Sequence, residues 1–144
     1  MKYSQSIEIS LPRERVIELL DNPDNMKHWQ PGLVSYEAIS GDAGKPGAKM
    51  KLLYKMGKRD VEMVETIIVR NFPDELSATY EAKGVWNKVE NTFSEPKAGT
   101  TVWKSDNEFK LKGFMKFMAA VMPGAFRKQS YKYLKYFKEF AEKS

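Results

Sequence analysis

The sequence contains no cysteine, and its single histidine is His28. The lack of cysteine excludes disulfide bonds, a thiolate nucleophile and every metal site built on sulfur. With one histidine, a paired-histidine metal site cannot form, and a Ser-His-Asp triad has only one available base. Asp24 lies four residues before His28, a spacing that favours a surface pair over a catalytic dyad. We therefore expect no metal and no cofactor.

Long apolar runs are also missing. No stretch approaches the roughly 20 residues that span a bilayer, and the first ten residues lack the apolar segment of a signal peptide. The segment GDAGKPG lacks the spacing and the Lys-Ser/Thr end of a phosphate-binding loop. No zinc-finger, helix-turn-helix or RNA-binding pattern is present. We expect a cytoplasmic protein that does not bind nucleic acid.

The composition is that of one ordinary globular domain. Of the 144 residues, 42% are hydrophobic and 30% are charged. A chain of this length can bury a core without metals or cross-links. Because no linker, internal repeat or low-complexity segment interrupts it, we predict a single domain over residues 1–144.

Alternation of apolar and polar residues with period two predicts strands in most of the chain. Residues 3–10 alternate in this way, with Ile7 and Ile9 on one face. Six further strands are predicted at 33–40, 47–56, 60–70, 75–83, 85–94 and 100–111. Between the first strand and the others, Pro12 opens a predicted helix, and a shorter helix ends at Pro31-Gly32.

The last thirty residues change to helical spacing. From Gly113 onward, apolar residues recur as on one face of a long amphipathic helix, and Pro123 is expected to break or kink it. A long helix that follows six strands packs across the concave face of a curved sheet. Any space left between helix and sheet becomes a cavity, and residues 113–122 could act as a lid over it.

Strand alternation also predicts which side chains face that cavity. Charged residues mark the outer face of each strand, Arg70 among them, and Val69 is assigned to the inner face. The predicted sheet side of the ligand site is Met50, Leu52, Tyr54, Met63, Glu65, Ile67, Ala78, Tyr80, Asn91, Trp103, Ser105 and Asn107. The predicted helix side is Met118, Met122, Phe126, Ser130, Tyr133 and Phe137.

A few polar residues stand out on this apolar inner face: Glu65, Asn87, Asn91, Ser105 and Asn107. A buried polar group without a partner costs about 1–3 kcal/mol, so such groups bond one another, water or a ligand. Both interpretations stay open from the sequence. Glu65 is the candidate catalytic residue, because desolvation would raise its pKa and allow it to act as a general acid or base.

The charge is distributed unevenly. The chain carries a net charge of +5, of which residues 110–144 contribute +7 and the remainder −2. The simplest interpretation is that the lysines form the solvated outer face of the last helix. The alternative is peripheral contact of that helix with an anionic membrane or an acidic partner. The oligomeric state is not predicted.

Three segments resemble the START-like helix-grip superfamily, also called SRPBCC: IEISLPRERVIELLDNPDNMKHW, VEMVETIIVRNFPDELSATY and NTFSEPKAGTTVWKSDNEF. The likeness covers nearly the whole chain and is nearest to the polyketide cyclase/dehydrase and lipid-transport branch. It implies an α+β fold in which a curved antiparallel sheet of about seven strands wraps around a long C-terminal helix, with two short helices after the first strand.

The resemblance leaves three functions to weigh. The first is transport or sensing of a small hydrophobic ligand such as a lipid, an isoprenoid or an aromatic metabolite. The second is a cyclase/dehydratase that acts on a ligand in the same cavity, using Glu65 and a tyrosine for proton transfer. The third is a protein-interaction module that uses the basic face of the last helix, which an interior filled by the protein's own side chains would favour. We rank the binding protein first.

Overall fold

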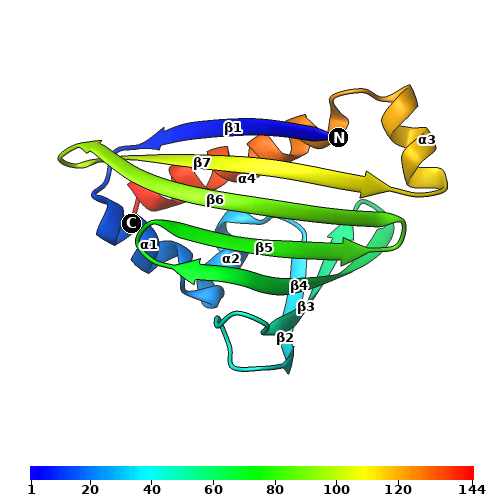
Figure 1. Cartoon of the computed structure of the whole chain (residues 1–144), viewed down its shortest axis with the longest axis horizontal. Coiled ribbons are helices and arrows are strands. Elements are labelled where there is room, and N and C mark those ends of the chain that lie inside the picture. The colour runs from blue at the N-terminus through cyan, green and yellow to red at the C-terminus, as the bar shows by residue number, and fades with distance from the viewer.

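A single antiparallel sheet of seven strands frames the protein in the computed structural model, which describes residues 1–144 (Figure 1). The strands run in the order β1-β7-β6-β5-β4-β3-β2, so β1 and β2 form the two edges. Their bounds are β1 Lys2–Ile9, β2 Leu33–Ser40, β3 Lys49–Met56, β4 Arg59–Asn71, β5 Glu75–Ala82, β6 Val85–Lys97 and β7 Thr100–Leu111. The seven predicted strands are confirmed, with small differences at their ends.

Helices follow the first strand and the last strand of the sheet. After β1 come α1 (Arg13–Leu20), a 3-10 turn η1 (Pro23–Asn25) and α2 (Met26–Trp29). After β7 come α3 (Phe114–Val121) and the long α4 (Ala125–Glu142), which runs behind β1 and β7 in Figure 1. This arrangement confirms the predicted helix-grip fold. No helix in the chain is both long enough and apolar enough to cross a bilayer.

The densest packing lies where α1, α2 and the C-terminal half of α4 meet β1, β6 and β7. Trp29, Trp103 and Phe137 contact one another edge to face, with ring centroids 5.3–6.4 Å apart. The full cluster is Ile9, Val16, Leu19, Trp29, Phe93, Trp103, Leu134, Phe137 and Ala141. Trp29 therefore anchors its helix to the core.

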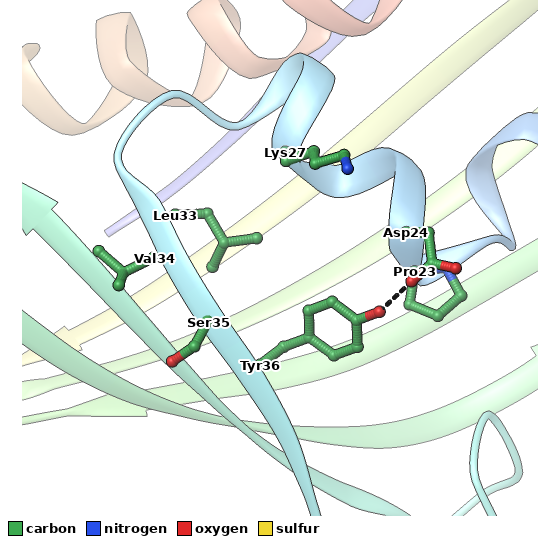
Figure 2. A pocket seen from close by; sticks show the side chains of 7 residues that line it. All are labelled: Pro23, Asp24, Lys27, Leu33, Val34, Ser35 and Tyr36. Atoms are coloured by element: carbon green, nitrogen blue, oxygen red, sulfur yellow. Dashed lines mark hydrogen bonds between the residues drawn. The ribbon is translucent and has the colours of Figure 1, made fainter.

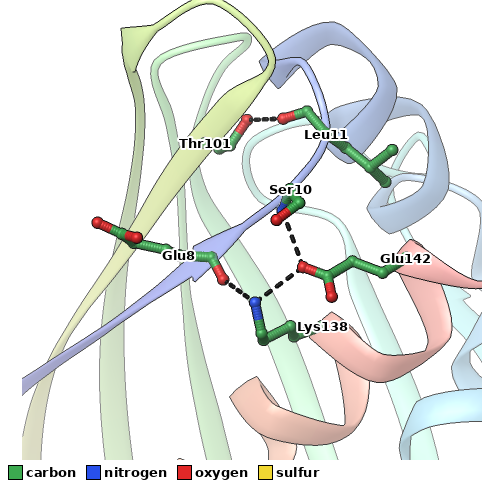
Figure 3. Close-up of polar contacts among 6 residues, drawn as sticks. All are labelled: Glu8, Ser10, Leu11, Thr101, Lys138 and Glu142. Carbon is green, nitrogen blue, oxygen red and sulfur yellow. Dashed lines mark hydrogen bonds and ion pairs between the residues drawn. The ribbon is translucent and has the colours of Figure 1, made fainter.

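Polar contacts hold the same end of α4 to the first strand (Figure 3). The Lys138 ammonium donates to the Glu142 carboxylate at 2.8 Å and to the Glu8 backbone carbonyl. The same carboxylate accepts a hydrogen bond from the Ser10 backbone N–H at 2.8 Å. These bonds satisfy polar groups just beyond the core cluster, so the end of α4 is fixed on both its apolar and its polar side.

The predicted break at Pro123 is confirmed. Gly124 adopts a left-handed conformation with φ of +87° between α3 and α4, which glycine accepts without steric cost. In Figure 1, α3 projects at one corner, beyond the end of β7. The assignment of Met122 to the inner face is wrong, because this residue ends α3 and is 51% exposed. The change of direction at Pro123-Gly124 takes it out of phase with the stripe on α4.

A bulge in β4 corrects two further assignments. Ile67 lies opposite Ala78, but Val69, two residues on, lies opposite Ser77, so one extra residue is inserted at Ile68. Val69 therefore shares the outer face, and Arg70, opposite Leu76, shares the inner one. The Arg70 guanidinium makes two hydrogen bonds, of 2.7 and 2.6 Å, to the carboxylate of Asp21 at the end of α1.

Candidate functional site

The register of three central strands brings a carboxylate and two tyrosines onto one part of the inner face. Glu65 of β4 lies between Met50 of β3 and Tyr80 of β5. Tyr54 lies farther along β3, on the same face. Because directly opposed residues on antiparallel strands point to the same side, all of these side chains face α4. The predicted inward orientation of this set is therefore confirmed.

Glu65 is the one carboxylate on this part of the face, and it has no basic partner. Desolvation raises its pKa, and a hydrogen bond from the Tyr80 hydroxyl offsets part of that rise. Burial likewise raises the pKa of Tyr80 well above its ordinary value, and the nearby Glu65 charge adds to the effect. The pair therefore favours a protonated phenol beside a carboxyl group that holds its proton to a higher pH than usual.

Tyr54 and Tyr133 extend this polar set toward the helix. The Tyr54 hydroxyl donates to the side-chain carbonyl of Gln30 at 2.6 Å. Burial is the main cause that raises the pKa of both phenols, and the proximity of Tyr133 contributes to the shift at Tyr54. The phenols of β3 and β5 thus lie near one carboxyl group, and Tyr133 of α4 lies near the Tyr54 phenol. Such a set can bind the polar end of a molecule or exchange protons with it.

The other polar residues of the inner face mainly bond one another. The indole N–H of Trp103 donates to the Asn91 side-chain oxygen at 2.8 Å, and the Asn107 amide donates to the Ser105 hydroxyl at 3.1 Å. The hydroxyl groups of Ser130 on α4 and Tyr3 on β1 are 2.6 Å apart. Of the two interpretations left open by the sequence, mutual hydrogen bonding is observed here. Glu65 differs from these residues because it is a carboxyl group whose hydrogen-bond partner is the Tyr80 hydroxyl.

An open groove of about 560 Å³ lies beside the start of α4. The turn between β3 and β4, the loop between α2 and β2, and the first turns of α4 border it. Its lining residues are Pro31, Gly32, Lys55, Met56, Gly57, Ala125, Phe126 and Gln129. Gly32 is required at this position, because a Cβ atom there would lie 2.8 Å from the Lys55 carbonyl oxygen. Phe126 is the predicted site residue that lines the groove.

A smaller hollow of about 290 Å³ lies between β2 and the segment η1–α2 (Figure 2). Asp24 and Tyr36 face each other across it, and the Tyr36 hydroxyl donates to the Asp24 carboxylate. His28 stacks instead on Phe140, with ring centroids 5.2 Å apart. The hollow contains none of the predicted site residues. The structure therefore gives no sign of an Asp24–His28 dyad.

The predicted site residues fall into three groups by exposure. The buried ones are Leu52, Tyr54, Ile67, Ala78, Asn91, Trp103, Ser105, Asn107 and Phe137. The half-buried ones are Met50, Met63, Glu65, Tyr80, Met118, Phe126, Ser130 and Tyr133, and Met122 is exposed. Trp103 and Phe137 belong to the core cluster. The half-buried residues of β3, β4 and β5 are the ones best placed to contact a ligand.

Two polar groups were not predicted from the sequence. Gln5 lies on the inner face of β1 and donates to the Arg127 carbonyl at 2.7 Å, but its own side-chain carbonyl oxygen is buried without a partner. The indole N–H of Trp29 is likewise buried and unpaired. The alternation that places Ile7 and Ile9 inward also turns Gln5 inward, so the inward position of Gln5 could have been predicted from the sequence. Only packing could show that the indole of Trp29 lacks an acceptor.

A family comparison matches residues 1–135 to the model described as polyketide cyclase/dehydrase and lipid transport. A search of curated proteins finds no match. Among solved structures, a conserved protein from Geobacillus kaustophilus is similar with a TM-score of 0.82 and 18% identity, over 100% of this chain and 97% of that one.

Two structures of named enzymes share the fold. The Zhui aromatase/cyclase from Streptomyces sp. R1128 has a TM-score of 0.74 and 14% identity, over 99% of this chain and 93% of that one. Norcoclaurine synthase from Thalictrum flavum, in complex with dopamine and hydroxybenzaldehyde, has a TM-score of 0.71 and 16% identity, over 97% and 85%. At these identities the likeness shows a common fold, and one fold supports many chemistries.

Proposed function

This chain belongs to the polyketide cyclase/dehydrase and lipid transport family, and we propose that it binds a small, mostly hydrophobic molecule between the sheet and α4. The walls of the proposed site are the half-buried side chains of β3, β4 and β5. Met50 and Met63 supply flexible apolar surface, and Glu65 and Tyr80 supply polar contacts. Mostly apolar walls with a few convergent polar groups are the usual design of a small-molecule site.

The observation that carries this proposal is the environment of Glu65 and Tyr80. Both groups lie deep enough for desolvation to dominate their pKa shifts. Yet both side chains keep a part of their surface accessible. This combination of desolvation and accessible surface supports an internal space beside the two side chains. Because its pKa is raised, Glu65 ionises less readily than an ordinary glutamate, and its protonated form can donate a hydrogen bond to a carbonyl or hydroxyl of a ligand without the cost of burying a charge.

The groove beside the start of α4 offers an entrance to this space. Phe126 lines the groove and also packs against Phe109 of β7, with ring centroids 5.0 Å apart and the ring planes inclined at 52°. It therefore belongs to both the surface opening and the inner face. Its opposite border includes Met56, whose side chain is flexible and apolar. An apolar molecule approaching between these two side chains meets little polar surface.

A direct test compares two equal substitutions on opposite faces of β4. Met63→Trp places a bulky ring in the proposed site, whereas Glu62→Trp places it on the exposed outer face one residue earlier. Titration with the neutral fluorescent probe N-phenyl-1-naphthylamine should show affinity at least about tenfold weaker for Met63→Trp and unchanged for Glu62→Trp. Equal affinity in the two variants would contradict binding at this face.

The natural ligand is identified by native mass spectrometry of the purified protein, followed by organic extraction. A bound apolar molecule present in the wild type and in Glu62→Trp, but absent from Met63→Trp, would both name the ligand and locate it. Retention of the same mass by Met63→Trp would exclude the proposed site. Because a ring at half-buried Met63 can cost more stability than one at exposed Glu62, circular dichroism and thermal melting must show that both variants are folded before the loss of ligand is assigned to the site.

The second candidate function is a cyclase/dehydratase acting in the same space. It is favoured by one observation: the pKa of Glu65 is raised beside the Tyr80 hydroxyl, as suits a general acid or base. Glu65→Gln should then reduce turnover of a polyketide-type substrate by about 100-fold or more with little change in its binding. Turnover that persists in Glu65→Gln would remove this residue from the chemistry.

A further inference from the structure

The exposed face of α3 is apolar, where a solvated helix normally presents polar side chains. Phe114, Phe117 and Val121 are 60%, 60% and 58% exposed, and Met122 just after the helix is 51% exposed. The spacing of the first three residues places them on one side of the helix. The two phenyl rings are 6.4 Å apart and form a continuous surface. Nothing else in the chain covers them.

The opposite side of α3 is held to the body of the protein. Gly84, in the turn between β5 and β6, approaches Lys112 and Met115 so closely that a Cβ atom would lie 2.9 Å from the Lys112 carbonyl oxygen. The Lys112 backbone N–H donates to the Gly84 carbonyl at 2.9 Å. Met115 is half-buried on this side, with its side chain against Gly84. The apolar face is therefore held outward from a defined corner of the molecule (Figure 1).

The segment of the chain that includes α3 carries charge of one sign. No acidic residue occurs between Glu108 and Glu139, and this interval contains eight basic residues: Lys110, Lys112, Lys116, Arg127, Lys128, Lys132, Lys135 and Lys138. Lys116 lies within α3, and Lys112 and Arg127 flank it along the chain. Exposed aromatic rings bordered by lysine and arginine match the chemistry of an anionic lipid surface, where rings enter the interface and cations meet phosphate groups.

We propose that α3 is a membrane-docking element that inserts Phe114, Phe117 and Val121 into the surface of an anionic bilayer. An eight-residue helix is about 12 Å long, so it lies in the interface and does not span the membrane. The sequence led us to expect membrane contact through the basic face of α4, and we now assign this contact to the apolar face of α3. The lysines then serve as the electrostatic part of the same contact. This docking does not depend on which molecule the interior binds.

Co-sedimentation with lipid vesicles tests the proposal. The wild-type chain should bind vesicles containing about a quarter phosphatidylglycerol, and bind phosphatidylcholine vesicles at least about tenfold more weakly. Phe114→Ser/Phe117→Ser should lower binding to the anionic vesicles at least about tenfold. Lys112→Gln/Lys116→Gln should lower it about fivefold for each lysine, with the difference disappearing at high salt.

The matched control is Val34→Ser/Ile39→Ser on the edge strand β2, where the two side chains are 60% and 51% exposed. This variant removes as many exposed apolar residues and should bind vesicles as the wild type does. Equal binding to neutral and anionic vesicles, or undiminished binding by Phe114→Ser/Phe117→Ser, would overturn the proposal. So would self-association in sedimentation velocity that this double variant abolishes without any vesicle binding, because a second copy would then cover the face.

Discussion

The inner face of the sheet has two halves that differ in how they are filled. At the half formed by β1, β7, α1, α2 and the end of α4, the side chains of Ile9, Val16, Phe137 and Ala141 are 0% exposed. At the half formed by β3, β4 and β5, Leu52 and Ala78 are 1% exposed, but Met50, Met63, Glu65 and Tyr80 retain accessible surface. One continuous sheet therefore supports both a close-packed core and a region that is only partly covered.

The position of α4 explains this difference. The helix packs most closely against β1 at one edge of the sheet and against α2, rather than against the central strands. Rings of Trp29, Trp103 and Phe137 fill the space on that side. The strands β3 and β4 curve away toward the other edge, and no aromatic cluster of this kind covers Met63 or Glu65. Stability and the proposed binding site thus occupy different parts of the same face.

The largest expected effect comes from deleting a side chain in each half. Phe137→Ala should lower the free energy of unfolding by about 3–5 kcal/mol, because it leaves a cavity in the packed half. Met63→Ala should lower it by about 1 kcal/mol, because Met63 is only half-buried. Urea denaturation followed by circular dichroism measures both values. Equal losses in the two variants would show that the halves are filled alike.

A smaller effect, dependent on pH, is expected at Glu65. Folding raises the pKa of this carboxyl by desolvation, so ionisation costs the folded state more than the unfolded state. The wild type should therefore lose stability as the pH rises above about 4.5, by about 1.4 kcal/mol for each unit of the rise in pKa. Glu65→Gln should remove this loss. The melting temperatures of the two proteins should differ more at pH 8 than at pH 4, with the variant gaining at the higher pH.

The smallest effect is expected at the polar contacts of the packed half (Figure 3). The pKa of Glu142 is lowered by its hydrogen bond with Lys138 and by the Ser10 backbone N–H. The carboxylate therefore stabilises the folded state at neutral pH, and this contribution is lost as the pH falls through its lowered pKa. Glu142→Gln should cost at most about 1 kcal/mol at pH 7. The cost of the substitution should vanish at pH 2. A cost that does not depend on pH would show that Glu142 stabilises the fold through the packing of its side chain and not through its charge.

The strands and the packed half could be predicted well from local patterns. Period-two alternation located every strand, and Pro12 and Pro31-Gly32 bounded the helical segment between β1 and β2. The helical spacing of apolar residues after Gly113 predicted a buried side of α4, and Leu134, Phe137 and Ala141 lie there. These signals are local because each apolar residue needs only a consistent direction along its own element to reach the core.

The details of the half formed by β3, β4 and β5, and of α3, were harder to predict from the sequence. Val69 and Arg70 exchanged faces because the bulge at Ile68 depends on pairing with β5, which alternation within β4 does not encode. Met122 was placed on the stripe of α4, but Pro123-Gly124 turned α3 in another direction. Asn91, Ser105 and Asn107 were chosen for their polarity, and their partners came from the register of β6 and β7 or from a neighbouring residue on the same strand.

The sequence by itself determined the order of strands and helices, the break at Pro123 and the inward direction of Glu65, because each follows from periodicity or from the geometry of one residue. Tertiary structure alone decided which polar groups satisfy one another, which half of the inner face is filled, and that the apolar side of α3 is left uncovered. Those outcomes depend on distances between residues far apart in the chain, and packing sets those distances.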